Sequence, residues 1–199
     1  IEINGKPILE IILENIINEG FTNFFISINY MADKIIDYFG DGSKWQVSIE
    51  YLQEKEPLGT AGSLSLLEVI PKKPIIVLNS DLVTKASFQN MLEFHSHQKN
   101  SELTVGLVEY DFEIPYGIAV LNEGEIVEIK EKPVQKFFVN AGMYIIEPRV
   151  LKEIPQNTFM DMTDVIRNII DSSKKTTAYP IREYWIDIGS IGDLKKAND

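Results

Sequence analysis

Two aspartates each lie at or next to a short apolar run that has the character of a buried strand. Asp81 ends the segment Asn79-Ser80-Asp81 directly after PIIVL, and Asp187 lies within YWIDIG at 184–189. Ligands of open α/β sheets bind beyond the carboxyl ends of the strands, and Mg²⁺ prefers carboxylate oxygens. Asp81 is therefore a candidate metal ligand, although it could equally serve a turn or a helix cap. Asp187 has apolar neighbours, so we expect it to need a metal, a base or backbone donors as a partner.

A glycine-containing segment, EKEPLGTAG at 54–62, joins a predicted strand to a predicted helix. Glycine lets the backbone approach a planar ligand closely, and the start of a helix offers free N–H groups. The alternative is an ordinary strand-to-helix loop in which Thr60 is the N-cap. On these residues alone we favour that alternative, because short motifs often match by chance.

Charged and amide side chains form a further group in the second half of the chain. Glu131-Lys132-Pro133 ends a predicted strand, and Asn140-Ala141-Gly142 begins seven residues after Pro133. A carboxylate, an ammonium and an amide together suit a polyhydroxylated, phosphorylated ligand. As isolated features, such residues are usually solvated surface groups.

Three other residues are expected to have structural and not chemical roles. His95 and His97 stand two apart on a predicted helix, so they do not share a face. We expect both to be at the surface or partly packed, and neither to bind a metal. Trp185 is expected to pack in the core, where aromatic side chains contribute most.

The composition limits the classes of function. The 199 residues are 44% hydrophobic and 25% charged, as in a globular domain, and the formal net charge is -11. So acidic a chain is poorly suited to bind nucleic acid or an anionic membrane. It has no cysteine, which excludes disulfides, zinc ribbons and thiol nucleophiles. It also has no apolar run near the length of a membrane span. We expect a cytoplasmic protein, because a cysteine-free chain fits a reducing compartment.

The elements that must position these side chains alternate between strand and helix. This order predicts one α/β domain over residues 1–199 with a mostly parallel sheet. In the first half, the predicted helices are 8–17, 31–39, 61–69 and 88–98, and the predicted strands are 24–28, 47–51 and 74–78. In the second half, strands are predicted at 103–108, 117–121, 126–130, 139–146, 176–181 and 184–188, and helices at 162–170 and from Leu194.

The motifs, taken in order, resemble the sugar-phosphate nucleotidyltransferases (nucleoside-diphosphate-sugar pyrophosphorylases). The resemblance covers residues 3 to about 198. It rests on INGKPILE at 3–10, EKEPLGTAGSL at 54–64, VLNSD at 77–81, YGIAVL and EIKEKP within 116–133, VNAGMYIIE at 139–147 and YWIDIGS at 184–190.

The resemblance implies a three-layer α/β sandwich with a mostly parallel, Rossmann-like mixed central sheet of the GT-A-like type. In this family a sugar 1-phosphate oxygen attacks the α-phosphorus of a nucleoside triphosphate and releases pyrophosphate, with Mg²⁺ bridging the reacting phosphates. Such catalysis depends on positioning and charge neutralisation. The implied roles are metal binding and catalysis for Asp81 and Asp187, sugar-phosphate binding and catalysis for Lys132, sugar binding for Gly117, Glu131 and Asn140, and nucleotide binding for Glu54, Leu58, Gly59 and Thr60.

The choice of base can be argued from Glu54. Guanine presents two adjacent donors, N1–H and N2–H₂, and a carboxylate can accept from both, whereas the acceptor–donor–acceptor edge of uracil or thymine suits an amide. Family members that use uridine or thymidine substrates typically have Gln at this position. The segment EPLGTAG also resembles the guanylyltransferase branch, which includes mannose-1-phosphate guanylyltransferases. We therefore expect GTP first and UTP or dTTP second.

One family feature is absent. The Gly-rich, Arg-containing loop after the first strand normally precedes the INGKP segment, which here stands at residues 3–7. We therefore expect an N-terminally incomplete domain that lacks its first strand and phosphate loop, and a chain that turns over little by itself. Two alternatives are a non-catalytic module that senses a sugar nucleotide, and a metal-dependent glycosyltransferase of related architecture. The identity of the sugar and the formation of a homo-oligomer are left open.

Overall fold

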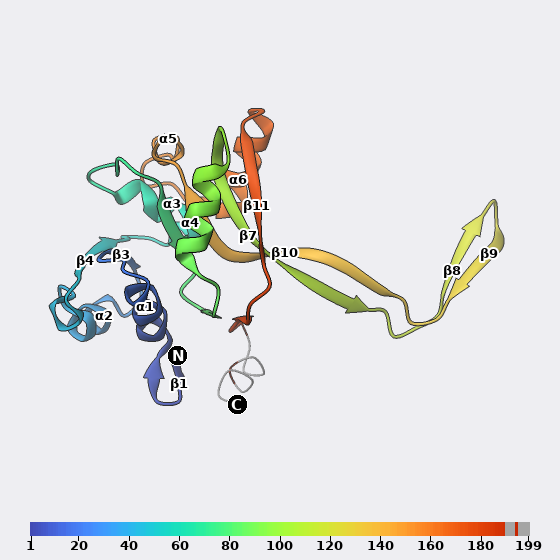
Figure 1. Cartoon of the computed structure of the whole chain (residues 1–199), viewed down its shortest axis with the longest axis horizontal. Coiled ribbons are helices and arrows are strands. Elements are labelled where there is room, and N and C mark those ends of the chain that lie inside the picture. The colour runs from blue at the N-terminus through green and yellow to red at the C-terminus, as the bar shows by residue number, and fades with distance from the viewer. Residues whose placement is uncertain (190–193, 195–199) are drawn as a thin grey trace.

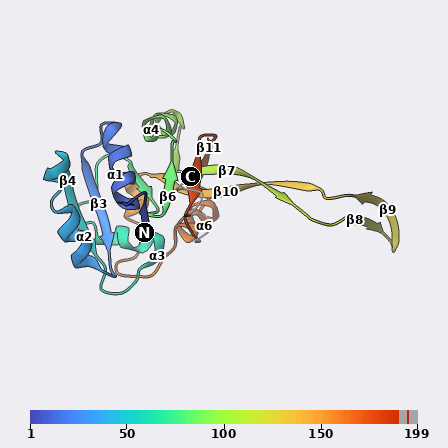
Figure 2. The same ribbon diagram turned by 90° about the horizontal axis from the view of Figure 1, so that it is seen from below.

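The computed structural model describes residues 1–189 and 194. It shows a layered body from which a long two-stranded arm projects (Figures 1 and 2). The centre of the body is a mixed sheet in the order β11-β7-β10-β5. β11 (Lys175–Ile181) is parallel to β7 (Ser101–Glu113), and both β7 and β5 (Ile75–Leu78) are antiparallel to β10 (Val134–Ile146). β5, β7 and β11 therefore run in one direction.

Helices cover both faces of this sheet, as the side chains of β10 show. Tyr144 and Ile146 pack in a buried cluster with residues of α5 and α6. Met143 and Ile145 pack in another with residues of α1 and α4. Successive strand residues point to opposite faces, so the three-layer α/β fold is confirmed. The α-helices are α1 (Ile8–Asn18), α2 (Ala32–Phe39), α3 (Gly59–Gly62), α4 (Phe88–His97), α5 (Pro148–Leu151) and α6 (Met162–Asp171), and the 3₁₀ turns are Ser43–Trp45 and Ser63–Leu66.

Capping residues in the sequence explain where the helices begin and end. Asp161 and Asp164 form a capping box at the start of α6. The Ser87 hydroxyl oxygen accepts the N–H of Asn90 at the start of α4, at 3.2 Å. Gly40 follows α2 with a φ of +56°, a conformation that glycine adopts at little cost.

Three smaller strand pairs complete the body. β3 (Asn23–Ile28) and β4 (Ser48–Gln53) are parallel and pack with α1 and α2 around the buried Leu13, Phe39 and Ile49. The other two pairs are antiparallel. They are β6 (Leu82–Thr84) with β12 (Trp185–Asp187), and β1 (Glu2–Ile3) with β2 (Lys6–Pro7).

The arm comprises residues 109–138. It contains the outer halves of β7 and β10 and, at its tip, the hairpin of β8 (Ile118–Asn122) and β9 (Glu125–Lys130). Both views show the hairpin standing away from the body (Figures 1 and 2). Aromatic side chains on the arm are exposed, including Phe138 at 69%. The arm therefore has little core of its own.

Most predicted elements are confirmed, with some differences. β7 and β10 extend five residues further into the arm than predicted, and the 61–69 helix is a short α-helix followed by a 3₁₀ turn. His95 is buried at 3% exposure and bonds Thr104 at 2.7 Å, so its expected place at or near the surface is wrong. The predicted helix from Leu194 falls almost entirely outside the described residues. No helix in the described part of the chain is long and apolar enough to cross a membrane.

Candidate active site

β6 and β12 bring Asp81 and Asp187 to the same edge of the body. Asp187 lies opposite Leu82, the residue after Asp81, and the N–H of Ile188 donates to the carbonyl of Asp81 at 2.9 Å. Asp81 Oδ1 is buried and has no hydrogen-bond partner among the described residues, whereas Asp187 is exposed. Asp187 does take part in a polar interaction, but as an exposed residue it is not forced to do so by burial. It is Asp81 that needs a partner because of burial, since a buried carboxylate oxygen without a donor is costly.

A bulge in β10 sets Asn140, Ala141 and Gly142 beside this edge. The N–H of Asn79 donates to the carbonyl of Gly142, and the indole N–H of Trp185 donates to the carbonyl of Ala141, both at 2.9 Å. Gly142 has a φ of +67°, and a Cβ there would lie 2.9 Å from the Asn79 amide nitrogen. Only glycine suits this position. Trp185 packs against the core as expected, and its hydrogen bond joins β12 to the bulge.

Asn140 is oriented by two contacts within the bulge. Its amide nitrogen donates to the hydroxyl of Tyr144 at 2.7 Å, and its Oδ1 accepts the N–H of Gly142 at 3.0 Å. Burial raises the pKa of Tyr144, and the hydrogen bond with Asn140 opposes that rise. The exposed amide keeps one N–H and one acceptor site, so it can still contact a ligand.

The glycine-containing loop is held against the start of α6. Asp161 Oδ1 accepts the N–H of Thr60 at 3.1 Å and its hydroxyl at 3.3 Å, and that hydroxyl accepts the N–H of Met162 at 2.8 Å. Gly59 has a φ of +76°, and a Cβ there would lie 2.7 Å from the Met160 carbonyl oxygen. The close approach that glycine permits here is to the protein's own backbone.

Glu54 lies at the start of the same loop and joins it to β3. One carboxylate oxygen accepts the hydroxyl of Ser27, and the other accepts the N–H of Leu58 at 2.7 Å. The N–H of Glu54 also donates to the carbonyl of Ile28 at 2.9 Å. Glu54 therefore positions Leu58 in the loop. Its oxygens still have unused lone pairs, because each can accept two hydrogen bonds.

The remaining predicted residues lie on the arm. A Cβ on Gly117 would meet Glu131 Oε2 at 2.8 Å, so these two residues are neighbours in the β8–β9 region. Lys132 follows with a φ of +42° and an exposed side chain. Asp81 and Asp187 are on the body, from which this part of the arm stands apart (Figure 1). The structure thus groups the aspartates with the Asn140 bulge, and groups Gly117, Glu131 and Lys132 separately.

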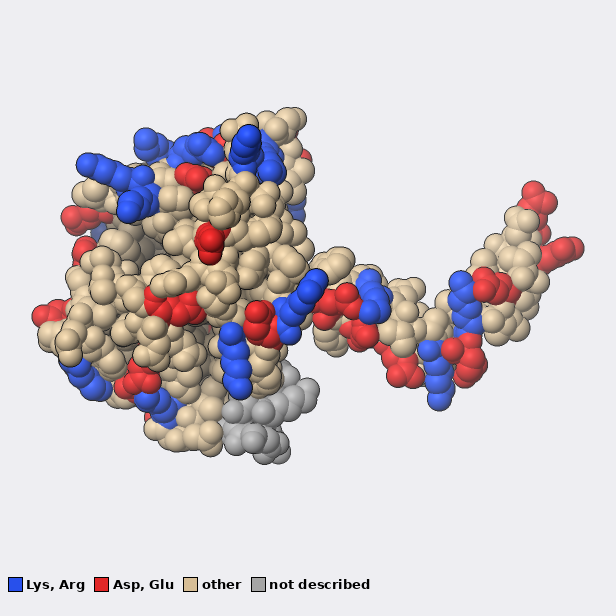
Figure 3. All heavy atoms as spheres, in the orientation of Figure 1, with Lys and Arg blue, Asp and Glu red and all other residues tan. Residues whose placement is uncertain are grey.

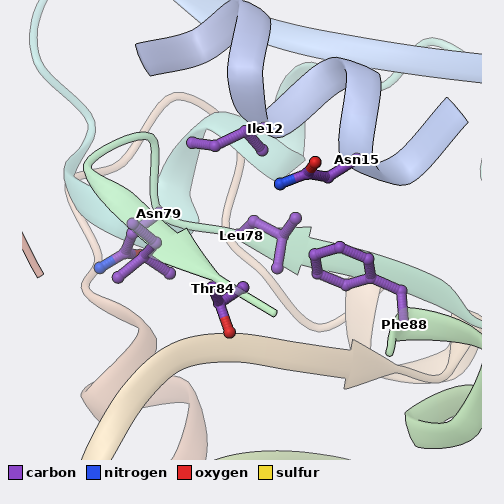
Figure 4. A pocket seen from close by; sticks show the side chains of 7 residues that line it. Ile12, Asn15, Leu78, Asn79, Thr84 and Phe88 are labelled. Atoms are coloured by element: carbon purple, nitrogen blue, oxygen red, sulfur yellow. The ribbon is translucent and has the colours of Figure 1, made fainter. Parts of the chain in front are cut away.

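A small cavity lies between α1 and the ends of β5 and β6 (Figure 4). Ile12 and Asn15 of α1 face Leu78 and Asn79 across it. Its volume is about 10 Å³, which is room for one water molecule. A nucleotide cannot enter it.

The profile of the nucleotidyl transferase family matches residues 1–199. The chain belongs to this family. A mannose-1-phosphate guanyltransferase from Pichia angusta is 31% identical over 98% of the chain and 55% of its own length. Mannose-1-phosphate guanyltransferase beta-B from Xenopus laevis is 31% identical over 96% of the chain and 54% of its own length. The chain thus spans about half the length of these curated relatives.

Solved structures give the same fold for this nucleotidyl transferase chain. The crystal structure of HddC from Yersinia pseudotuberculosis matches with a TM-score of 0.75 and 25% sequence identity. The match covers 100% of the chain and 87% of HddC. The family and the fold predicted from the motifs are therefore confirmed.

Sequence reasoning missed the residues that support the nucleotidyl transferase motifs. Asp161 lies about 100 residues from Thr60, and Ser27 lies 27 residues from Glu54. The polar residue before the apolar-periodic run of α6 was a usable signal, since Asp is a preferred N-cap. Nothing in the sequence indicated that its carboxylate also binds the loop.

Proposed function

We propose that the protein transfers a nucleotidyl group from a nucleoside triphosphate, with GTP preferred, to a sugar 1-phosphate. An oxygen of the sugar phosphate forms a bond to the α-phosphorus, and the bond from that phosphorus to the β-phosphate oxygen breaks, giving a nucleoside diphosphate sugar and pyrophosphate. The names of the relatives support mannose 1-phosphate as the acceptor.

The observation that carries the proposal is the carboxylate pair. Asp81 has a buried oxygen without a donor among the described residues, and Asp187 lies on the adjoining strand. This arrangement leaves an anionic edge that requires a cation. An anionic edge by itself would repel a triphosphate.

The donor set fits Mg²⁺. Both candidate ligands are carboxylate oxygens, which hard cations prefer. Among the described residues, no cluster of three or more His, Cys, Asp or Glu is suited to hold a metal. Mg²⁺ is typically held by one or two carboxylates together with substrate phosphates and water. When bound, it would neutralise charge on the reacting phosphates. Asp81 and Asp187 would hold it.

The other residues would bind and orient the two substrates. Leu58, Gly59 and Thr60 would contact the base, on a loop that Asp161 and Glu54 hold in place. Asn140 would donate to a sugar hydroxyl from the bulge. The roles proposed for Gly117, Glu131 and Lys132 in sugar and phosphate binding require the arm to approach the two aspartates when substrates are bound.

The GTP preference is tested by Glu54→Gln. A glutamine can still accept the Leu58 N–H through its oxygen and donate to Ser27 through its nitrogen, so the loop should keep its shape. Guanine would lose an acceptor for one of its donors, which costs about 1–3 kcal/mol. The ratio of kcat/KM for GTP to that for UTP should fall by a factor of about 5 to 150. An unchanged ratio would refute the role of Glu54 in selecting the base.

Pyrophosphate release tests the reaction itself. The protein should release pyrophosphate from GTP only when mannose 1-phosphate and Mg²⁺ are present. Asp81→Asn should lower kcat by about a thousandfold, whereas the matched control Asp33→Asn, exposed in the first turn of α2, should not. Saturable binding of GDP-mannose without any pyrophosphate release would instead indicate the sensing module.

A further inference from the structure

Cationic side chains gather at the end of the sheet remote from Asp81. β5, β7 and β11 begin at this end and β10 ends there, so the adjoining loops meet along one edge, which we call the strand-start end. Figure 3 shows basic side chains grouped over α5 and the end of α4. Seven of the 19 Lys and Arg residues lie in these loops or in the first or last turns and strand residues beside them, in a chain with a net charge of -11. They are Lys72, Lys73, Lys99, Arg149, Lys152, Lys174 and Lys175.

Acidic residues neutralise only part of this charge. Glu102 accepts from Arg149, and Glu153 accepts from Lys174. Lys73 and Lys99 form no ion pair with any residue that the structure describes. The strand-start end therefore has positive charge left for an external anion.

A pocket opens among these cations. It has a volume of about 510 Å³, within the usual range for sites that hold small molecules. Its walls come from the loops before β5 and β7, the end of α4 and the segment after β10. The polar residues that matter here are Lys73, His95, Lys99, Asn100, Glu147 and Arg149.

Two of these side chains are fixed in place. Arg149 donates through Nε to Glu102 and through Nη2 to the carbonyl of Ser101 at 3.2 Å, which leaves its Nη1 hydrogens for a ligand. His95 is buried, bonds Thr104 at 2.7 Å, and has its Nε2 3.4 Å from Glu147 Oε1. The pocket thus combines two side chains oriented by hydrogen bonds, Arg149 and His95, with further cationic donors and one carboxylate acceptor.

We propose that this strand-start pocket binds a small phosphate monoester that also has hydroxyl groups. Lys73, Lys99 and Arg149 would bind the phosphate, because ammonium and guanidinium groups form charge-assisted hydrogen bonds with its oxygens. Glu147 would accept from a hydroxyl group. The four residues of β5 separate this pocket from the Asp81 edge by about 13 Å of strand. The site is therefore distinct from that of the proposed reaction.

Glycerol 3-phosphate is a suitable probe, with glycerol as the control that lacks phosphate. Titration of the ¹⁵N-labelled chain should give saturable NMR shift changes at the amides of Asn100 and Ser101, which lie in the pocket. Shift changes at residues 79–82 or 140–142 would report the reaction site separately. The double variant Lys73→Gln/Lys99→Gln should weaken binding at the pocket about tenfold or more.

Lys34→Gln is the matched control, because Lys34 is exposed on α2, away from the strand-start end. It should leave the affinity at the pocket unchanged. The inference is overturned if glycerol binds as well as glycerol 3-phosphate, if only the reaction-site amides shift, or if the double variant binds like Lys34→Gln. None of these readouts depends on catalysis, so failure of the proposed reaction would be seen separately.

Discussion

Replacing Asp161 by alanine should release the loop at 58–62 from α6. The carboxylate accepts the N–H of Thr60 at 3.1 Å and its hydroxyl at 3.3 Å, and it caps α6 in a box with Asp164. Loss of an N-cap costs about 1 kcal/mol, and loss of the hydrogen bond to the N–H of Thr60, an exposed residue, costs at most about 1 kcal/mol more. The free energy of unfolding should therefore fall by about 1–2 kcal/mol. Asp161→Asn should lose less, because it keeps an oxygen acceptor.

Ser87→Ala provides a matched loss on the other face of the sheet. The Ser87 hydroxyl caps α4 by accepting the N–H of Asn90 at 3.2 Å, and it donates to Glu19 at 3.0 Å. Its removal also costs about 1–2 kcal/mol. Denaturant unfolding should place the Ser87→Ala and Asp161→Ala variants close together in stability. If the two variants are equally stable, any difference in the behaviour of the loop at 58–62 is a local effect and not a result of global destabilisation.

Hydrogen exchange and nucleotide kinetics provide that local measurement. In Asp161→Ala, the amide of Thr60 should exchange about tenfold faster or more, since 1.4 kcal/mol corresponds to a factor of ten. The KM for GTP should rise while kcat changes less, and Asp161→Asn should restore most of the affinity. Ser87→Ala should leave both readouts near their starting values. Equal effects of the Ser87→Ala and Asp161→Ala changes would refute a specific role for Asp161 in holding the loop.

Three further changes test other contacts of the site. Gly59→Ala should destabilise the fold by about 2–4 kcal/mol, because the new Cβ would lie 2.7 Å from the Met160 carbonyl oxygen. Gly5→Ala, also at positive φ but with open space around it, should cost only about 1–2 kcal/mol in the same denaturant titration. Trp185→Phe should cost about 1–2 kcal/mol by leaving the Ala141 carbonyl without its indole donor; an unchanged unfolding midpoint would contradict this. Lys132→Ala should lower kcat/KM for the sugar 1-phosphate about a hundredfold, and Lys130→Ala, two residues away on the arm, should not.

The helices and strands of the layered fold could be predicted because their buried apolar residues recur in the sequence at a regular spacing. Met162, Val165 and Ile169 are buried on α6 at helical spacing, and β10 alternates between two buried faces at Met143–Ile146. A strand or helix that packs on a core must place apolar residues at the period of its own geometry. The element type follows from that period.

The arm was not predictable by the same route. Beyond Val108 and Val139 both faces of the ribbon are exposed, so no core selects which residues are apolar. The predicted strands therefore stopped where burial stops. Pairing between residues such as Glu113 and Val134 extends them, and that pairing depends on partners 21 residues apart.

Some features of the candidate site could likewise be predicted from the sequence, and others could not. Motif order pointed to Asp81, Asp187 and the loop at 58–62. The β6–β12 pair brings the two aspartates together, and the loop follows β4 of another sheet. Burial of single side chains could not be inferred. Asp187 is exposed despite its apolar neighbours, and His95 is buried on a helix of ordinary polarity. Whether each side chain is buried depends on which other elements pack against it, and the local sequence does not show this.

The two ends of the sheet differ in charge. At the Asp81 edge the chain presents carboxylates, so an anionic substrate can bind there only with a cation that offsets them. At the strand-start end Lys73 and Lys99 have no acidic partner among the described residues, so an anion can bind there directly. Removal of divalent cations with EDTA should therefore abolish nucleotide binding at the first edge and leave glycerol 3-phosphate binding at the second intact. Loss of both would mean that the two ends do not bind anions by these separate means.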